Sequence, residues 1–158
     1  MQKLSIRDID LIVYDFDGVM TDNKVLVSED GKETVYCHRS DGLAISMIKD
    51  LGVPQVIIST EKNAVVQVRA QKLGIEVIHD VKDKKSCLID YCNKNGFSLQ
   101  KIVYIGNDIN DYEAMAIVGF PLAPLDASRK VKDIAKMIIE RNGGDGVIKE
   151  FFEVILDS

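Results

Sequence analysis

Residues 11–22 read Leu-Ile-Val-Tyr-Asp-Phe-Asp-Gly-Val-Met-Thr-Asp, an apolar run that ends abruptly in a group of acidic residues. The run belongs to a segment from Ile9 to Tyr14 that is short and rich in β-branched residues, which predicts a buried strand. Asp15 and Asp17 follow this strand at once. Crowded carboxylates are costly to bury unless a cation or a phosphate group organises them. This stretch therefore predicts a core strand with a ligand site at its carboxyl end.

The alternation of apolar runs and amphipathic stretches continues along the rest of the chain. Strands are predicted at residues 55–59, 75–78, 102–105 and, as an edge strand, 120–123; helices are predicted at residues 41–51, 63–73, 83–95, 110–118 and 128–135, and after the glycines at 143–146. The helix that starts at Asp41 is expected to bury a face made of Leu43, Ala44, Met47, Ile48 and Leu51. This alternation predicts an α/β fold with a doubly wound parallel sheet, whose function lies beyond the carboxyl ends of its strands.

Length and composition bound the class of protein. With 158 residues, 46% of them hydrophobic and 28% charged, the chain fits one globular domain over residues 1–158. The net charge of −5 and the lack of a basic run argue against nucleic acid or an anionic membrane as a partner. Cys37, Cys87 and Cys92 lack metal-ligand spacing, and no apolar signal segment opens the sequence, so we expect reduced thiols in a cytoplasmic protein.

A hairpin is predicted directly after the first strand. The segments Val25-Leu26-Val27 and Thr34-Val35-Tyr36 flank a loop that contains Asp30-Gly31, a pair that favours hairpin turns because glycine tolerates a positive φ. The first run, Val25-Leu26-Val27, is apolar at successive positions, so a strand there would carry apolar side chains on both faces. We therefore expect a homo-oligomer in which a neighbouring copy covers the hairpin.

Polar residues follow each of the first four predicted core strands. They are Asp15 and Asp17 after the first, Ser59-Thr60-Glu61 after the second, Lys82-Asp83-Lys84 after the third and Gly106-Asn107-Asp108-Ile109-Asn110-Asp111 after the fourth. Because the carboxyl ends of parallel strands share one edge of a sheet, these groups should converge. Mg²⁺ takes hard oxygen ligands and usually shares them with phosphate. The sequence therefore predicts a Mg²⁺-dependent phosphoryl-transfer site.

The motif Asp-x-Asp-Gly-Val-x-Thr-Asp at residues 15–22 resembles the signature of the haloacid dehalogenase (HAD) superfamily of phosphatases, whose four motifs all occur here in the expected order. The hairpin and the tail at residues 143–150 are similar to those of one branch, the capless, tetrameric phosphatases of 3-deoxy-D-manno-octulosonate (KDO) 8-phosphate. Related members act on nonulosonate 9-phosphates, and a similar domain is fused to some CMP-sialic acid synthetases. The resemblance implies a HAD-type fold with a β-hairpin flap and no cap domain, and a hydrolase of KDO or sialic acid biosynthesis that assembles as a homotetramer.

The resemblance also implies roles for the residues at the strand ends. Asp15 would be the nucleophile, forming an aspartyl-phosphate, and Asp17 the general acid and base. Ser59 would donate a hydrogen bond to the phosphate, and Lys84 would neutralise its charge.

Structural roles for the same residues stay open at this point. The Asp-x-Asp pair could form a turn or a helix cap, and Ser59 could cap the helix that follows it. Lys84 could be a surface lysine, with Lys82 and Lys85 as competing candidates, although the order Asp83-Lys84 matches the family.

Mg²⁺ would be held by Asp15, Asp17 and Asn107, with Asp108 as a further ligand and Asp111 behind them. The family has Asp at the position of Asn107. An amide oxygen can still bind Mg²⁺, but the replacement removes one negative charge. We therefore expect weaker Mg²⁺ binding, partly recovered if Asp108 takes over directly or through a water.

Five residues are candidates for binding the sugar acid: Arg39, Thr60, Glu61, Arg69 and Lys72. Thr60 stands where the family has Gly, and Glu61 where the KDO 8-phosphate phosphatases usually have Arg. Members similar to the nonulosonate 9-phosphate phosphatases carry Glu there, with a lysine corresponding to Lys72, which favours a nine-carbon acid such as KDN 9-phosphate over KDO 8-phosphate. Arg39 and Arg69 could pair with the carboxylate of the substrate or be solvated surface charges.

An alternative function belongs to a different class: a weakly active or inactive HAD domain that serves as an oligomerisation module linked to CMP-sugar-acid synthesis, which Asn107 favours. A receiver-type signalling domain is rejected because an acidic cluster follows the fourth strand here. A dinucleotide enzyme is rejected because no G-x-G-x-x-G follows the first strand. No partner spacing supports a site at His38 or His79, so both are expected to be structural or exposed.

Overall fold

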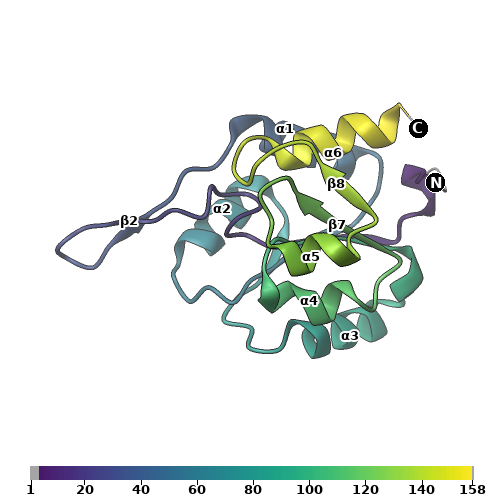
Figure 1. Cartoon of the computed structure of the whole chain (residues 1–158), viewed down its shortest axis with the longest axis horizontal. Coiled ribbons are helices and arrows are strands. Elements are labelled where there is room, and N and C mark those ends of the chain that lie inside the picture. Colours follow the sequence, from purple (N-terminus) through teal and green to yellow (C-terminus); the bar gives the residue numbers. More distant parts are fainter. Residues whose placement is uncertain (1–3, 158) are drawn as a thin grey trace.

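A parallel sheet forms the centre of the computed structural model, which describes residues 4–157 (Figure 1). Within these residues the sheet has six strands in the order β5-β4-β1-β6-β7-β8. Their bounds are β1 Leu11–Tyr14, β4 Gln55–Ile58, β5 Glu76–Ile78, β6 Ile102–Ile105, β7 Phe120–Pro124 and β8 Met137–Ile139. The predicted doubly wound parallel α/β fold is confirmed.

In the described part of the chain, three helices cover each face of the sheet. One face packs against α1 (Arg39–Asp50), α2 (Val65–Leu73) and α6 (Val147–Leu156), and the other against α3 (Lys84–Asn95), α4 (Ile109–Met115) and α5 (Arg129–Ile134). Short 3₁₀ turns at Ile6–Asp8 and Leu99–Lys101 precede β1 and β6. In the part of the chain that the structure describes, no helix is long and apolar enough to cross a membrane.

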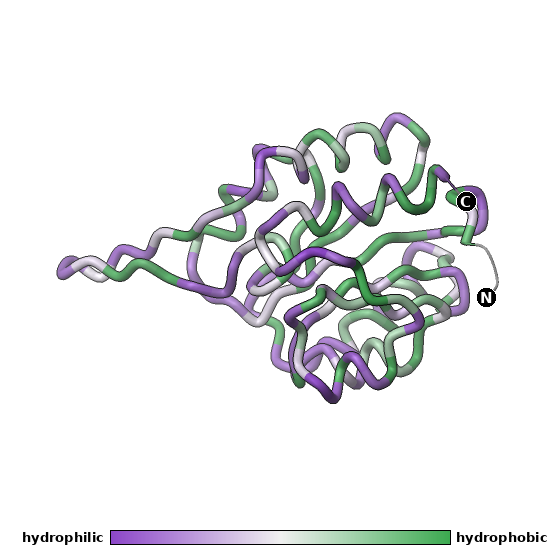
Figure 2. Tube along the Cα trace, turned by 45° about the horizontal axis from the view of Figure 1, so that its top comes forward, coloured by the Kyte–Doolittle hydropathy of each residue, from purple (hydrophilic) through white to green (hydrophobic). Residues whose placement is uncertain are grey.

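The central strand β1 contains the apolar run at residues 11–14. All four of its residues are buried, with Ile12 and Tyr14 in the core cluster on one face and Leu11 and Val13 in the other. The tube in Figure 2 shows this hydrophobic interior. The strand order departs in opposite directions from β1, toward β4 on one side and β6 on the other. A crevice for ligands forms beyond the carboxyl ends of the strands at such a point.

The expected core face of α1 is partly wrong. Leu43, Met47 and Leu51 are exposed, whereas Ala44, Ile45 and Ile48 are buried. Because Leu43, Met47 and Leu51 are four residues apart, they line one side of the helix. A hydrophobic side alone does not show which side of the helix packs on the sheet. The helix also begins at Arg39, two residues before the predicted start.

The predicted edge position of the strand at residues 120–123 is also wrong. The apolar run Met137–Ile139 forms β8, which pairs in parallel with β7 beyond it, so β7 is an inner strand. A run of three apolar residues is too short to be distinguished from loop by periodicity, and its strand pairing appears only when the sheet assembles.

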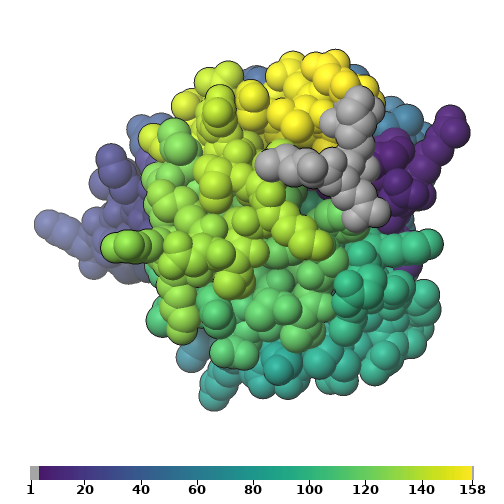
Figure 3. Space-filling model, turned by 45° about the vertical axis from the view of Figure 1, so that its right-hand side comes forward, coloured from purple at the N-terminus to yellow at the C-terminus, as the bar shows by residue number. Residues whose placement is uncertain are grey.

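The predicted hairpin forms from β2 (Leu26–Val27) and β3 (Glu33–Thr34), paired antiparallel and separate from the main sheet. It projects from the body of the molecule, as Figures 1 and 3 show. Leu26 is 69% exposed and Tyr36, which follows β3, is 79% exposed. Within residues 4–157 this hairpin is what the chain inserts between β1 and α1, where a cap domain could otherwise stand.

Candidate active site

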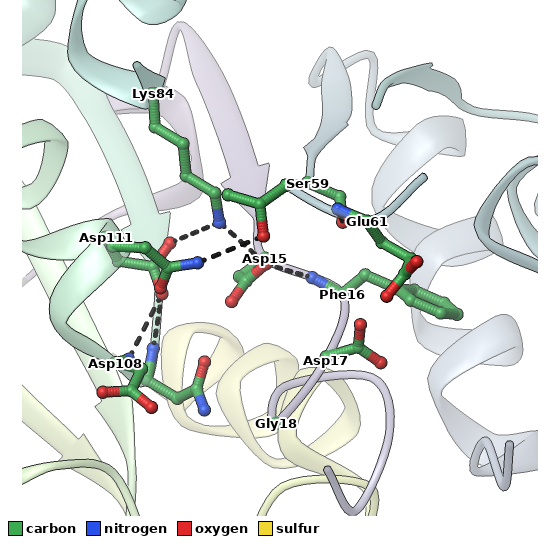
Figure 4. A network of polar contacts seen from close by, with 12 residues as sticks. Asp15, Phe16, Asp17, Gly18, Ser59, Glu61, Lys84, Asp108 and Asp111 are labelled. Carbon is green, nitrogen blue, oxygen red and sulfur yellow. Dashed lines mark hydrogen bonds and ion pairs between the residues drawn. The ribbon is translucent and has the colours of Figure 1, made fainter. Parts of the chain in front are cut away.

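Polar side chains from four strand ends meet above the carboxyl edge of the sheet (Figure 4). Asp15 follows β1, Ser59 follows β4, Lys84 is the first residue of α3, and Asn107 follows β6. Asp15, Ser59 and Asn107 border a hollow of about 240 Å³ whose full lining is Asp15, Asp17, Asn23, Ser59, Thr60, Asn107, Asp108, Ile109 and Asn110. The structure thus brings together the residues that the sequence placed at a phosphoryl-transfer site, with Lys84 in contact with Asp15 from behind rather than on the wall of the hollow.

Asp15 is buried and oriented by two donors. Its Oδ1 accepts hydrogen bonds from the N–H of Phe16 at 2.7 Å and from Lys84 Nζ at 2.8 Å. Burial raises the pKa of Asp15 well above its ordinary value, and the charge of Asp111 raises it further, while Lys84 lowers it. A second cation near Asp15 would therefore help to keep this carboxylate ionised and nucleophilic.

Lys84 lies between two carboxylates. Its Nζ is 2.8 Å from Asp15 Oδ1 and 2.8 Å from Asp111 Oδ1, and its side chain is 1% exposed. Burial alone would lower the pKa of Lys84, but the charges of Asp15 and Asp111 outweigh it and raise the pKa overall. The surface role that stayed open for Lys84 is excluded, and Lys82, one of its two competitors, is exposed.

Asp111 organises the loop after β6 from below. Its Oδ2 accepts from the N–H groups of Asn107 at 3.0 Å and Asp108 at 3.3 Å, and its Oδ1 accepts from Tyr104 Oη at 2.9 Å as well as from Lys84. Asp111, Tyr104, Lys84 and Asn107 are all buried. The carboxylate therefore fixes both Lys84 and the main chain of Asn107, a role that spacing in the sequence did not reveal.

The side chain of Asn107 meets two oxygens of the first loop. One amide atom lies 2.9 Å from Asp15 Oδ2 and 3.0 Å from the main-chain oxygen of Asp17. With Nδ2 in that place the amide donates to both oxygens; with Oδ1 there, three oxygens face one another. Ligands at right angles around Mg²⁺, each about 2.1 Å from the ion, lie about 3 Å apart, so the residues present fit Mg²⁺.

This oxygen set is not a cluster of side-chain carboxylates. Within residues 4–157 no three His, Cys, Asp or Glu side chains gather as metal ligands. The oxygen set instead combines one carboxylate, one amide and one main-chain oxygen. Asp108, which we expected as a further ligand, is exposed and caps α4, its Oδ1 accepting from the N–H of Ile109 at 2.7 Å.

Asp17 is held by Thr21, a residue to which the sequence assigned no separate role. Thr21 is fully buried, and its hydroxyl donates to Asp17 Oδ1 at 3.3 Å while accepting from the N–H groups of Gly18 at 3.3 Å and Asn23 at 3.1 Å. Burial raises the pKa of Asp17, and the charge of Glu61 raises it further. A carboxyl with a raised pKa is suited to donate a proton.

Ser59 does not cap the following helix. α2 begins only at Val65, whose N–H donates to Asn63 Oδ1 at 2.9 Å. Instead, Ser59 is buried and its hydroxyl accepts from the N–H of Glu61 at 3.1 Å, which holds the turn after β4. Ser59 also lies on the wall of the hollow, next to Asp15, Asp17 and Thr60.

The other candidate substrate-binding residues lie along a row of hollows. Next to the hollow at Asp15, and sharing Asp17 and Asn23 with it, is one of about 210 Å³ that Glu33 and Glu61 line. A third, of about 720 Å³, shares Glu33 with the second and contains Arg69 and Lys72. The fourth, of about 400 Å³, shares those two cations and is lined by Cys37, Arg39, Gly42, Ser46, Arg69, Lys72 and Leu73.

The far end of this row is basic. No Asp or Glu lines the fourth hollow, whereas Arg39, Arg69 and Lys72 do. Arg69 Nη2 donates to the main-chain oxygen of His38 at 3.3 Å, and Arg69 Nε is buried without a partner. His38 itself caps α1 by accepting from the N–H of Ser40, and His79 contacts Gln67, so both play the structural roles expected.

A central strand that ends in two carboxylates, a buried lysine on α3 and an oxygen site for a cation together define a class of phosphate-handling hydrolase. Residues 2–151 match the sequence pattern of the haloacid dehalogenase-like hydrolases. The chain belongs to this family.

Individual relatives narrow the class. The chain is 29% identical to the 3-deoxy-D-manno-octulosonate 8-phosphate phosphatase of Haemophilus influenzae over 99% of this chain and 87% of that protein. It is similar to the enzyme of the same name from Moraxella catarrhalis, solved with magnesium, phosphate and KDO, with a TM-score of 0.92 and 30% identity over 96% of this chain and 88% of that one. The predicted phosphatase class is confirmed, and the predicted cofactor, Mg²⁺, is confirmed at the level of the family.

A second kind of relative is longer. The chain is 29% identical to the N-acylneuraminate cytidylyltransferase of Oncorhynchus mykiss over 92% of this chain, but it spans only 35% of that protein. The expected similarity to a domain of sialic acid-activating enzymes is thus confirmed.

Proposed function

We propose that this protein hydrolyses the phosphate monoester of a 2-keto-3-deoxy sugar acid. The observation that carries the proposal is the row of hollows, with the catalytic carboxylates at one end and three cations at the other. Carboxylates in the hollow beside Asp17 accept hydrogen bonds, and the hydroxyl groups of a sugar chain can donate them. A substrate with phosphate at one end, hydroxyls in the middle and a carboxylate at the other end matches this sequence of charges.

The identity of the middle residues favours a nine-carbon acid. Glu61 lines the hollow next to Asp17, and Lys72 lies further along the row. A nonulosonate 9-phosphate such as KDN 9-phosphate places its carboxylate further from the phosphate than KDO 8-phosphate does, which suits a basic end that is separated from Asp15 by two hollows. KDO 8-phosphate, the substrate named for the relatives, is the second candidate.

In the proposed mechanism Asp15 attacks phosphorus, and the bond between phosphorus and the sugar oxygen breaks. Asp17 donates its proton to that oxygen, so the sugar acid leaves as an alcohol and Asp15 becomes an aspartyl-phosphate. Asp17, now ionised, takes a proton from water, which attacks phosphorus and releases phosphate from Asp15. Lys84 balances the charge of Asp15, and Ser59 donates a hydrogen bond to a phosphate oxygen.

Mg²⁺, held by Asp15, the main-chain oxygen of Asp17 and Asn107, would neutralise phosphate charge beside the nucleophile. Asp108 lies at the rim of the hollow, from where it would reach the ion through a water. Asp111 would act behind the ligands by holding Asn107 and Lys84.

The protein is further proposed to be a homo-oligomer, most simply a tetramer, in the cytoplasm. The exposed apolar hairpin supports the assembly, because such a surface is costly to leave in water. A neighbouring copy over the hairpin would also help to close the open row of hollows.

The test is a phosphate-release screen with Mg²⁺ over KDN 9-phosphate, KDO 8-phosphate and glucose 6-phosphate, with Asp15→Asn as the blank. We expect the two sugar acids to be turned over faster than glucose 6-phosphate, with KDN 9-phosphate first. Arg69→Met should raise KM for the sugar acids while leaving turnover of p-nitrophenyl phosphate within about threefold, since guanidinium pairs with carboxylate. Equal rates on all three substrates would contradict the proposal.

The alternative, an inactive module linked to CMP-sugar-acid synthesis, is favoured by Asn107 and by the likeness to part of a cytidylyltransferase. The buried Asp15–Lys84–Asp111 arrangement counts against it, because an oligomerisation module has no need of an ion pair that costs desolvation energy. Hydrolysis of p-nitrophenyl phosphate that Asp15→Asn removes would reject the alternative.

A further inference from the structure

The segment Gly143–Gly146, here called the glycine segment, lies against the loop that carries Asp17. The N–H of Gly144 donates to the main-chain oxygen of Val19 at 3.0 Å. A Cβ atom at Gly143 would overlap the main-chain oxygen of Gly18, and one at Gly144 would overlap the main-chain nitrogen of Asp22. Main chain thus packs directly on main chain, an approach that only glycine permits.

Two carboxylates hold the main chain at the start of the glycine segment and just beyond its end. Asp126, just after β7, accepts from the N–H of Gly143 at 2.9 Å. Asp41, in the first turn of α1, accepts through one oxygen from the N–H groups of Ile148 at 3.1 Å and Lys149 at 3.0 Å, at the start of α6. Asp126 follows β7, which lies on one side of β1 in the sheet, whereas Asp41 lies in α1, which leads to β4 on the other side. The segment is therefore tied to two separate elements.

Thr21 connects the glycine segment with Asp17. The main chain of Thr21 is among the atoms nearest to the would-be Cβ positions of both Gly143 and Gly144. The Thr21 hydroxyl donates to Asp17 Oδ1. A shift of the glycine segment would therefore move Thr21, and with it the carboxyl group proposed to protonate the leaving alcohol.

We propose that Asp41 and Asp126 are positioning residues: they hold the glycine segment against the first loop and thereby keep Asp17 in line with the leaving-group oxygen. The inference rests on the role of Asp17 under the proposed function. It assigns a task in the reaction to two carboxylates that contact neither the substrate nor Mg²⁺.

The test uses kcat/KM on p-nitrophenyl phosphate, whose leaving group departs without a proton, and on phenyl phosphate, whose leaving group benefits from one. For Asp126→Ala and Asp41→Ala we expect phenyl phosphate hydrolysis to fall about 10- to 100-fold, and p-nitrophenyl phosphate hydrolysis less than about threefold. Asp126→Asn and Asp41→Asn should restore the ratio, because an amide oxygen still accepts from a main-chain N–H. Asp126 is exposed, so its variant tests the inference even if Asp41→Ala fails to fold.

Asp10→Ala is the matched control. Asp10 accepts from the N–H of Ser98 at 3.0 Å, at the opposite end of the sheet, and its loss should leave the ratio of the two substrates unchanged. Equal losses on both substrates in the Asp126 and Asp41 variants, or no rescue by Asn, would overturn the inference. Asp17→Asn tells a failure of the proposed function from a failure of the inference. If this variant lowers kcat/KM equally on both substrates, the acid role of Asp17 is wrong and the inference falls with it. If Asp17→Asn changes the ratio of the two kcat/KM values but the Asp41 and Asp126 variants do not, only the inference is wrong.

Discussion

At the scale of single residues, Asn107 stands where the resemblance to the family led us to expect Asp. Its amide faces Asp15 Oδ2 and the Asp17 main-chain oxygen, so an Asp here would add a negative charge at the proposed ion. Opposite charges about 4 Å apart are worth about 4 kcal/mol at an intermediate dielectric. We expect Asn107→Asp to lower the Mg²⁺ concentration for half-maximal rate by about tenfold or more, and Asp108→Asn to raise it.

Asn110→Asp is the control for Asn107→Asp, because it adds the same charge to the wall of the same hollow, at a side chain whose amide contacts Thr60. It should change the Mg²⁺ dependence far less. An unchanged Mg²⁺ titration in Asn107→Asp would mean that position 107 does not bind the ion.

Gly18 lies directly beside Asn107. It has a φ of +84°, and a Cβ there would overlap the Asn107 amide. Gly18→Ala should therefore displace that amide and raise the Mg²⁺ requirement, besides the strain of about 1 kcal/mol or more that a side chain incurs at positive φ. Gly52→Ala is the matched control, with a φ of +80° and open space around it. It should lower the thermal stability and leave the Mg²⁺ titration as in the wild type; equal Mg²⁺ titrations for both variants would contradict this account.

At the scale of elements, α1 and α6 are joined by Asp41. One oxygen of this buried carboxylate caps α6, and the other has no partner. Burial raises the pKa of Asp41 in spite of its two hydrogen bonds. Because its pKa is higher in the folded than in the unfolded state, the protonated carboxyl favours folding, and this contribution is lost as the pH rises from the ordinary value of 3.8 through the folded pKa.

We therefore expect the free energy of unfolding of the wild type, relative to that of Asp41→Asn, to fall as the pH is raised through this window. Asp41→Ala should be less stable than Asp41→Asn at every pH, by about 1 kcal/mol, because it also loses the cap. Chemical denaturation between pH 4 and pH 8 measures both differences. A wild type that gains stability over Asp41→Asn with rising pH would show that the charged form is the favoured one.

At the scale of the whole molecule, the hairpin is the feature that a single copy leaves unexplained. Leu26 on the hairpin is 69% exposed. A group of large apolar side chains that is this exposed is unfavourable in water and marks an interaction surface. We expect light scattering at micromolar concentration to report a multiple of the 17.6 kDa chain mass, most simply four. Leu26→Lys should lower that mass and reduce turnover of the sugar acid, since a neighbour would no longer close the site.

Leu51→Lys tests whether any charged substitution of an exposed apolar residue has the same effect. Leu51 lies at the end of α1 and is 52% exposed. Its variant should keep the oligomeric mass. A wild type that is monomeric would remove the idea of assembly through the hairpin altogether.

The chemistry of the strand ends was accessible from the sequence because it is local. Asp15 and Asp17 follow β1 by covalent connection, and parallel strands bring Ser59, Lys84 and Asn107 to the same edge whatever the details of packing. The fold class, the hairpin and the family followed from the same local patterns. Orientation did not: the exposed stripe of Leu43, Met47 and Leu51 and the inner position of β7 depend on which surfaces meet once the chain is folded.

Long-range hydrogen bonds were decided by the tertiary structure alone. Asp41 meets Ile148 across 107 positions of sequence, and Asp126 meets Gly143 across 17, contacts that no periodicity or motif announces. The same holds for the two ion pairs of Lys84 and for the row of hollows that ends at Arg39. A side chain's residue type sets what it can bind, but its partner depends on which distant segment the folded chain brings within about 3 Å of it, the length of a hydrogen bond.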